Sequence, residues 1–473
     1  MANVLFLDIG SRFTKYSFIY LSENNFKNLN TFEKNNNEKN ANEVAKDEIK
    51  KGEIKNESKN NFYEILALGL ADSEGINYQR VVDYSLYEDF ITSLINDIKK
   101  ETGKNIDIIF LSVGGANLYS VVNNLKIDVN NQEITHTFLD DYLSKKAKIG
   151  KIQADNIVAL PEDFENIISI LPRLFIIDSV DKTYNPVGLT AKNSLEIELF
   201  ISSIKGDHKK NITKPFEKLG FEVNDNINLN SKNVLFFIPN VLAYSKGISS
   251  GGFNSRKLRE LPPLAIIDLG YSITELIVIL EGAPYVKVYI KRGLRNILKD
   301  ISFALGVTLE EAENILLNIN ISKIYKEDDY IEINPFFYYD SNVIQKEKVQ
   351  IYSLIDTVII PRVEEISKLL KSALANSFSY SLISNMLLVG GGAEIKGIDK
   401  IIYNIFEIRT TPFKINKQFF DNYRLTNLYG MIEVFVDKVF QDYKRSKYEI
   451  GLVKSNKVKG IIEKISDFFK NFF

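Results

Sequence analysis

Cysteine is absent from this chain and histidine is scarce, and each shortage excludes a class of chemistry. Without cysteine, the chain cannot form disulfides, thiolate zinc sites or a cysteine nucleophile. The two histidines, His136 and His208, are far apart in the sequence and match no metal-binding spacing. We therefore interpret both as solvent-facing or structural residues.

An excess of one charge and a long apolar run are also missing. The 59 basic residues are balanced by 61 acidic ones, so the overall charge does not favour nucleic acid as a partner. No segment reaches the roughly 20 apolar residues of a spanning helix. Asp8 and Arg12 interrupt a first apolar run that lacks a basic leader, so we expect no signal peptide. The composition agrees with a cytosolic globular protein, and the length of 473 residues predicts at least two domains.

Three segments share one pattern, an apolar run that ends in a turn of small or hydroxyl-bearing residues. They are Phe6–Lys15, Leu264–Thr274 and Met386–Ala393. Backbone N–H groups at the end of such a strand can face an anion. The first two turns also carry an aspartate, Asp8 and Asp268. Two facing carboxylates suit a Mg²⁺ ion that keeps several waters, so the pattern predicts an α/β protein that binds a phosphate group with Mg²⁺.

Each turn alone is ordinary in α/β proteins, but their order and spacing resemble the phosphate-1, phosphate-2 and adenosine motifs of the actin superfamily. The resemblance implies an ATP cleft between two related lobes, with Asp8 and Asp268 holding Mg²⁺ through water. It places in the nucleotide site Asp8, Gly10, Ser11 and Lys15 of the first motif, Asp268, Gly270, Ser272 and Thr274 of the second, Gly390, Gly391 and Gly392 of the third, and Glu313 beside the nucleoside.

A second resemblance is more specific. Ile170–Asp178 and Asn185–Leu189 look like the inserted subdomain of the bacterial division family FtsA, where Pro186 and Gly188 would build a tight turn. The surrounding sequence predicts strand, helix, strand and strand at Ile106–Val113, Glu133–Ala147, Ile167–Ile177 and Ser194–Ile204. The similarity covers nearly the whole chain except 22–61, about 324–348 and the segment before the C-terminal end.

Two positions depart from the family pattern. A lysine usually follows the Glu-Ala-Glu motif by three residues, and here the residue is Leu316. Arg292-Gly293 likewise replaces a commoner Gly-Gly. Phosphate binding is therefore better supported than selective adenine binding.

The resemblance predicts an actin-like two-lobed ATPase fold with an inserted subdomain of FtsA type. Residues 22–61 are rich in Asn, Lys and Glu, so we expect a disordered insertion in a hairpin there. The expected parts are a first lobe over 1–104, the inserted subdomain over 105–203, more of the first lobe over 204–262, the second lobe over 263–404 with its smaller part near 296–351, a return to the first lobe over 405–440, a linker over 441–456 and a helix over 457–473.

The last segment predicts an amphipathic helix at a membrane surface. Its apolar residues fall within an arc of roughly 140° when each residue advances the helix by about 100°. An alternative is a helix that docks on the core. Because ordering costs about as much as such a helix gains by insertion, one copy should bind reversibly, and a polymer would attach through many. The arc contains Val458, Ile461, Ile462, Ile465, Phe468, Phe469, Phe472 and Phe473.

As a whole, the resemblance implies an FtsA-like, ATP-binding protein that self-assembles into filaments and anchors FtsZ filaments to the cytoplasmic face of the membrane at the division site, with other division proteins. No residue stands out as a strong general base, so any hydrolysis should be slow and nucleotide should act as an assembly switch. Alternatives are a PilM-like pilus assembly protein, which lacks an amphipathic end, or a small-molecule kinase of the same superfold.

The partner site is predicted on the helix that begins at Pro361-Arg362. FtsA proteins bind the C-terminal peptide of FtsZ on their second lobe, and Arg362 would hold a carboxylate of that peptide. The alternative is an ion pair of Arg362 with Glu365 or Glu364 inside the helix.

Overall fold

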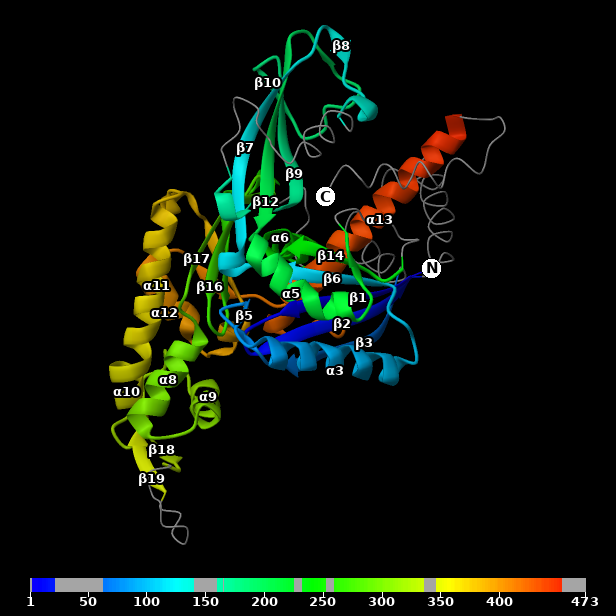
Figure 1. Ribbon diagram of the computed structural model, residues 1–473. Coiled ribbons are helices and arrows are strands. Elements are labelled where there is room, and N and C mark those ends of the chain that lie inside the picture. The colour runs from blue at the N-terminus through cyan, green and yellow to red at the C-terminus, as the bar shows by residue number, and fades with distance from the viewer. Residues whose placement is uncertain are drawn as a thin grey trace, which may run out of the picture.

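The computed structural model describes residues 2–21, 63–139, 160–164, 166–224, 232–251, 259–335 and 346–452, with side chains described to residue 439. The expected insertion at 22–61 and the expected terminal helix at 457–473 lie outside the described residues. The predicted α/β class is confirmed, because two mixed sheets with packed helices form the two lobes (Figure 1).

The first lobe is built on a six-stranded sheet. An antiparallel hairpin, β1 and β2, lies beside the parallel strands β6 and β14. Even-numbered side chains of β1, such as Phe6, face a core with α13, whereas odd-numbered ones, such as Leu5, face a core with α3 and α5. In sheet order the strands are β13 (Glu222–Val223), β14 (Val234–Pro239), β6 (Ile108–Val113), β1 (Ala2–Ile9), β2 (Phe13–Leu21) and β3 (Tyr63–Asp72).

Four helices flank this sheet. Helix α3 starts where Asp83 accepts a hydrogen bond from the N–H of Leu86, and it ends at Gly103 in the left-handed conformation. Helix α6 follows β14 directly, which brings its first turn to the carboxyl end of the parallel strands. The helices are α3 (Tyr84–Thr102), α5 (Gly206–Lys218), α6 (Asn240–Gly251) and α13 (Thr426–Leu452).

The second lobe repeats the same arrangement. Its hairpin β15–β16 lies beside the parallel strand β20, as β1–β2 lies beside β6. The strands are β17 (Ala283–Ile290), β16 (Thr274–Leu280), β15 (Leu264–Leu269), β20 (Asn385–Val389) and β21 (Thr410–Pro412), and the helices are α8 (Leu294–Leu305), α9 (Leu309–Asn318), α10 (Ile351–Leu354), α11 (Ile360–Ala375) and α12 (Ile398–Phe406). A small hairpin, β18 (Tyr330–Ile333) with β19 (Glu347–Gln350), precedes α10.

A separate antiparallel sheet projects from the two lobes (Figure 1). The expected range of 105–203 starts with β6, but β6 pairs with β1 and β14 of the first lobe, so the separate sheet starts only at Leu118. The expected helix starts at His136 and is described as far as Leu139. The tight turn is confirmed, since the N–H of Leu189 bonds to the carbonyl of Pro186. The strands are β10 (Asp181–Thr183), β9 (Asn166–Ile177), β12 (Ser194–Ile204) and β7 (Leu118–Asp128).

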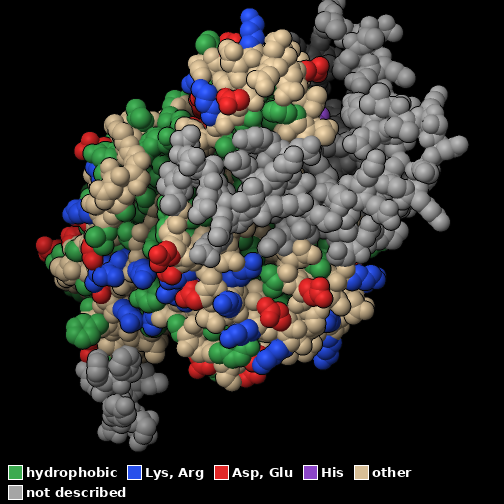
Figure 2. Space-filling view, turned by 45° about the horizontal axis from the view of Figure 1, so that its top comes forward, with side chains coloured by type: hydrophobic (Ala, Val, Ile, Leu, Met, Phe, Trp, Pro, Cys, Tyr) green, Lys and Arg blue, Asp and Glu red, His purple; other side chains and the backbone are tan. Residues whose placement is uncertain are grey.

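Two helices differ from expectation. Helix α13 continues to Leu452, so most of the linker expected at 441–456 is helical; its residues are largely good helix formers and include no proline. A π-helical turn, Ile355–Ile359, joins α10 to α11 just before Pro361, which cannot donate a backbone hydrogen bond. On the face seen in Figure 2, basic and acidic side chains are interspersed, as the balanced composition suggests.

Helices α6 and α13 cross at two glycines. A Cβ atom at Gly430 would lie 1.7 Å from the carbonyl oxygen of Ala243, and one at Gly247 would lie 2.7 Å from that of Thr426. Both nearest atoms are backbone, so no side chain can move aside. The glycines therefore set how closely these two helices approach.

We expect Gly430→Ala to lower the free energy of unfolding by about 3 kcal/mol, because the helices must separate. Urea unfolding would measure the loss. Gly103→Ala is the matched control: Gly103 has a φ of +65° and nothing lies within 4 Å of its added Cβ, so only about 1 kcal/mol of backbone strain is expected. Equal losses in the two variants would contradict this interpretation of the helix crossing.

Candidate functional site

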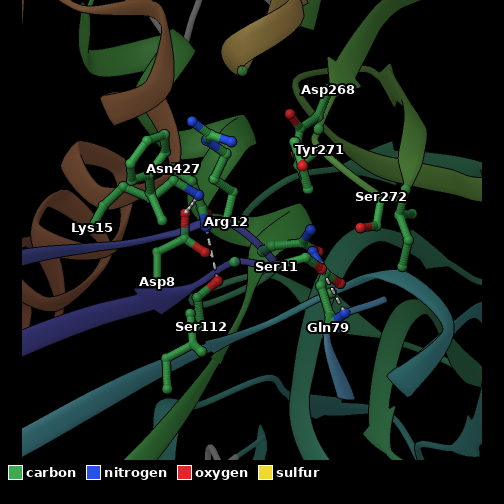
Figure 3. A pocket seen from close by; sticks show the side chains of 18 of the residues that line it. Asp8, Ser11, Arg12, Lys15, Gln79, Ser112, Asp268, Tyr271, Ser272 and Asn427 are labelled. Atoms are coloured by element: carbon green, nitrogen blue, oxygen red, sulfur yellow. Dashed lines mark hydrogen bonds and ion pairs between the residues drawn. The ribbon is translucent and has the colours of Figure 1, made fainter. Parts of the chain in front are cut away.

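A cleft between the lobes brings the three predicted turns together. Figure 3 shows side chains of the first two turns, such as Ser11 and Ser272, in this cleft. Each turn follows β1, β15 or β20, and ligands of open α/β sheets bind beyond strand ends of this kind. The cleft has an empty volume of about 940 Å³, open solvent included. Of the residues predicted for the nucleotide site, the cleft is lined by Asp8, Gly10, Ser11, Lys15, Asp268, Gly270, Ser272, Glu313, Gly390 and Gly391.

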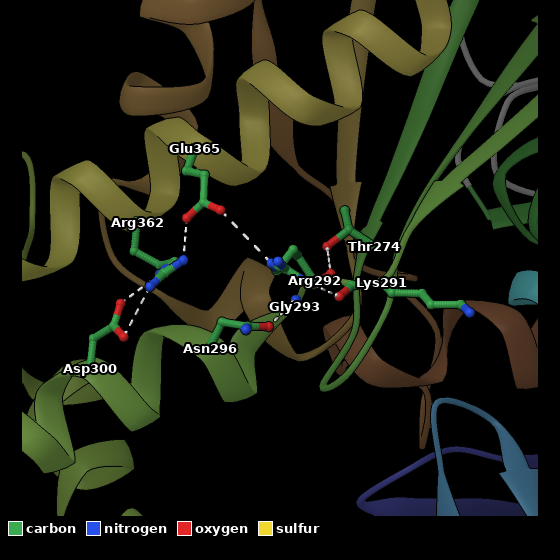
Figure 4. Close-up of polar contacts among 8 residues, drawn as sticks. All are labelled: Thr274, Lys291, Arg292, Gly293, Asn296, Asp300, Arg362 and Glu365. Atoms are coloured by element: carbon green, nitrogen blue, oxygen red, sulfur yellow. Dashed lines mark hydrogen bonds and ion pairs between the residues drawn. The ribbon is translucent and has the colours of Figure 1, made fainter.

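Thr274 and Gly392 do not line the cleft. The hydroxyl of Thr274 is buried and donates to the carbonyl oxygen of Arg292 at 2.8 Å (Figure 4). A Cβ at Gly392 would lie 2.2 Å from Cγ of Leu269, so this glycine allows the third turn to pack against the strand of the second. Both residues support the turns and are placed away from a ligand.

The two aspartates predicted to face Mg²⁺ have different partners. Lys15 donates to Asp8 at 3.0 Å, and Tyr244 donates to Asp268 at 2.7 Å. Burial, and secondly the charge of Glu275, raises the pKa of Asp268 to about 7, against the opposing effects of Lys15 and the tyrosine hydroxyl. Asp268 therefore favours a nearby cation more strongly than an exposed aspartate does.

The cleft suits a cation that keeps its waters. No group of three or more His, Cys, Asp or Glu side chains that could hold a metal ion occurs among the described residues. Three further residues that line the cleft, Gln79, Asn240 and Asn427, each have a buried amide oxygen that accepts no hydrogen bond from the protein. Such oxygens can accept hydrogen bonds from water, so the donor set fits a hydrated Mg²⁺ held by Asp8 and Asp268.

Glu313 is surrounded by cations from outside its own helix. It forms an ion pair with Arg12 at 2.8 Å and lies 3.8 Å from Arg424. Arg424 also donates twice to Glu394, at 2.8 and 2.6 Å. Leu316, at the position of the family lysine, is fully buried in the core of the second lobe. The cations beside Glu313 therefore come from other elements of the chain.

Sequence reasoning missed several residues of the cleft. Arg12 lies inside the first motif, so a signal existed for it, whereas Tyr244 reaches the cleft on α6, which follows β14 directly. Gln79 and Arg424 lie in segments without a motif, and only the fold brings them to the site. His208 also lines the cleft; it is buried, which is one of the two alternatives expected for it.

A buried ionic cluster joins the lobes. Glu275 of β16 accepts from the N–H of Gly115 at 2.8 Å and from Asn240 at 2.7 Å. Lys287 of β17 lies 3.1 Å from Glu275 and donates to the carbonyl of Gly115 at 2.6 Å. The charges of Glu275 and Lys287 are paired with each other, and both side chains also bond to Gly115. The cluster therefore holds β16 and β17 of the second lobe against the loop that follows β6 of the first.

Histidine burial makes stability depend on pH. Burial lowers the pKa of His208 from 6.5 to about 4, with Asp207 opposing the shift and Arg80 adding to it. The folded state then binds fewer protons than the unfolded state between these values, so stability is lost as the pH falls through this window. Asp268 has the opposite sign, because its pKa is raised.

We therefore expect His208→Gln to reduce the loss of stability on acidification from pH 7 to pH 4.5, relative to the unchanged protein. Urea unfolding at several pH values would measure the slope. Parallel curves for His208→Gln and the unchanged protein would contradict the assigned direction.

Arg362 does not present a free guanidinium (Figure 4). It donates to both oxygens of Asp300 on α8, at 2.5 and 3.1 Å, and also to Glu365. Arg292 lies 3.8 Å from the same Glu365. The intra-helix pair with Glu365, given as the alternative, is present, while the partner that accepts two bonds, Asp300, lies on another helix. Binding of a partner carboxylate by Arg362 stays a prediction, and it would have to displace these contacts.

The two lobes of repeated topology and the cleft between them define the actin-like ATPase fold. A solved structure of the PilM–PilN type IV pilus biogenesis complex has this fold, with a TM-score of 0.52 and 10% identity over 91% of this chain and 98% of that one. No protein-family model matches the chain.

The curated relatives are cell division proteins FtsA, and the predicted resemblance to that family is confirmed. The chain is 24% identical to FtsA of Borreliella burgdorferi over 348 residues, which cover 73% of this chain and 77% of that protein. It is 26% identical to FtsA of Enterococcus hirae over 376 residues, covering 78% and 77%. Among the described residues, no helix is long and apolar enough to cross a membrane.

Proposed function

We propose that this chain binds ATP with Mg²⁺ in the cleft between its lobes. The observation that carries the proposal is the convergence of three turns from distant parts of the sequence on one cleft. Ser11, Lys15 and the turn at Gly270 would bind phosphates, and Gly390 and Gly391 would leave room for the nucleoside. When bound, Mg²⁺ would neutralise phosphate charge, and Asp8 and Asp268 would orient its waters.

Nucleotide would act mainly as an assembly signal. No residue stands out in the sequence as a strong general base, and Asp8 and Asp268 would be engaged in orienting the waters of Mg²⁺. Any hydrolysis would then be slow. Lobe closure around a nucleotide could bias the chain toward the conformation that polymerises.

The wider role we propose is that of an FtsA-type division protein. Similarity to FtsA over about three quarters of the chain supports it. In this role the chain would self-assemble, bind the C-terminal peptide of FtsZ on its second lobe and attach to the inner membrane surface through residues 457–473. Other division proteins would be further partners. The polymer would supply the many weak membrane contacts that one short helix lacks.

A pilus role is the alternative. The structural likeness to PilM shows the fold alone at 10% identity, and the sequence relatives favour division. The two roles differ in their partner: FtsZ filaments in one, and a peptide of a membrane pilus protein in the other.

Recruitment of FtsZ to liposomes would decide between them. Fluorescent FtsZ filaments and anionic liposomes would be mixed with the full chain and Mg-ATP, then sedimented or imaged. We expect FtsZ on the liposomes only when the chain is present, and not with FtsZ that lacks its C-terminal peptide. Liposome binding of the chain without recruitment of FtsZ would overturn the division role and leave ATP binding untouched.

A further inference from the structure

The nucleoside side of the cleft contains an ion pair whose two members come from different lobes. Arg12 lies in the turn between β1 and β2 of the first lobe, and Glu313 lies on α9 of the second. Their side chains meet at 2.8 Å and are 28% and 11% exposed. Residue 316, three positions after Glu313 on the same helix, is Leu316, which is buried in the core of the second lobe and offers Glu313 no charge.

Aromatic rings fix the direction of Arg12. Its guanidinium lies 5.1 Å from the ring centre of Phe13 and 5.5 Å from that of Tyr271, which belongs to the second lobe. Arg424 lies 5.2 Å from the same Phe13 ring. Cation–π contacts of this kind hold the guanidinium within the cleft rather than in solvent.

Part of the Arg12 side chain still lacks a partner. Its Nε atom is buried and makes no hydrogen bond in the structure, although its Nη2 atom bonds to Glu313. The carboxylate of Glu313 is shared between Arg12 and the more distant Arg424. Removal of Arg12 would therefore leave Glu313 without its nearer cation.

We propose that Arg12 is a positioning residue for the nucleoside part of the ligand. It holds the carboxylate of Glu313 from the opposite lobe, so the nucleoside wall is complete only when the lobes are closed. A pair within one helix would form whether or not the lobes meet. The inference rests on the proposed ATP binding, and it makes nucleoside contact and lobe closure a single event in this chain.

The proposal separates nucleoside binding from phosphate binding. Phosphates are expected to contact the turn backbone, Ser11 and Lys15, which do not depend on the Arg12 side chain. Inorganic tripolyphosphate carries the phosphates without the nucleoside, so it serves as the probe that does not use Glu313. The affinities for Mg-ATP and Mg-tripolyphosphate would be measured by calorimetry, and dissociation of a fluorescent ATP analogue by stopped flow.

We expect Arg12→Ala to release the ATP analogue at least about tenfold faster and to weaken Mg-ATP binding to a similar extent. Tripolyphosphate affinity should change by less than about threefold. Glu313→Gln should show the same selectivity, and the double variant should be no worse than the single variants, because both act through one pair. Arg12→Lys should restore part of the slow release.

Arg295→Ala is the matched control. Arg295 of the second lobe donates to Asn77 of the first at 3.2 Å, so it also joins the lobes, but it does not line the cleft. It should leave ATP release unchanged. Equal losses of ATP and tripolyphosphate affinity in Arg12→Ala, or additive effects with Glu313→Gln, would overturn the inference. Failure of the unchanged protein to bind either ligand would instead overturn the proposed ATP binding.

Discussion

Replacement of Asp268 with alanine is expected to weaken Mg-ATP binding by at least about 100-fold, or about 2.7 kcal/mol. Asp268 is one of two carboxylates in the cleft that can orient the waters of Mg²⁺, and Lys15 already binds the other, Asp8. Loss of either partner in such an arrangement costs much of the metal affinity. Isothermal titration calorimetry with Mg-ATP would measure the change.

The Asp268→Ala variant should remain folded. Burial raises the pKa of Asp268, so removal of its charge at pH 8 stabilises the empty protein and offsets the loss of the hydrogen bond from Tyr244. Unchanged ATP affinity in a folded Asp268→Ala variant would remove the basis for the ATP assignment. Loss of binding together with unfolding would require a second test of the same site.

Gly390 provides that test through the backbone. It has a φ of +81°, and an added Cβ would lie 2.1 Å from Oδ1 of Asp268, so Gly390→Ala should displace the carboxylate without removing it. Gly391→Asp should also block binding, because a Cβ at this position would lie 3.6 to 3.9 Å from atoms of the Arg424 guanidinium, and the added carboxylate would occupy the space expected for the nucleoside. Gly103 also has a positive φ, of +65°, but it does not line the cleft, so Gly103→Ala should bind Mg-ATP normally.

The sequence predicted the parts of the site that depend on backbone turns. Asp8, Asp268 and Gly390 stand at the ends of apolar strands, and the parallel pairing of those strands with their neighbours brings them to one cleft. A turn after a strand is a local pattern, so it can be recognised in one sequence. A local pattern does not show which way each side chain points. Thr274 belongs to the second motif, but its hydroxyl donates to the carbonyl of Arg292 and does not line the cleft.

The remaining site residues depend on contacts between distant segments. Arg424 reaches Glu394 and Glu313 only because the chain returns to the first lobe after β21, and no motif marks that return. Arg362 shows the same limit on the outer surface: Asp300, its main partner, lies on another helix, so the sequence could suggest only the neighbour Glu365. Ion-pair partners across elements follow from tertiary packing.

Substitution of Phe468 and Phe469 with glutamate is expected to reduce liposome binding at least about tenfold. Both residues belong to the apolar arc of residues 457–473, and each buried phenylalanine contributes about 1 to 1.5 kcal/mol at a membrane surface. Two carboxylates on that arc would also resist transfer out of water. Co-sedimentation of the full chain with anionic liposomes would measure the bound fraction.

Position on the helix gives the matched control for this test. On the predicted helix, Phe469 would lie about 30° from the centre of the apolar arc and Asn471 about 130° from it, so Phe469→Glu and Asn471→Glu would each add one negative charge at different faces. Repulsion between an added negative charge and anionic lipid would weaken both variants equally. We expect only Phe469→Glu to release the chain from liposomes, because only this variant places the charge on the apolar arc. If neither variant loses liposome binding but Phe469→Glu lowers thermal stability, residues 457–473 dock on the protein core, and the membrane attachment must lie elsewhere.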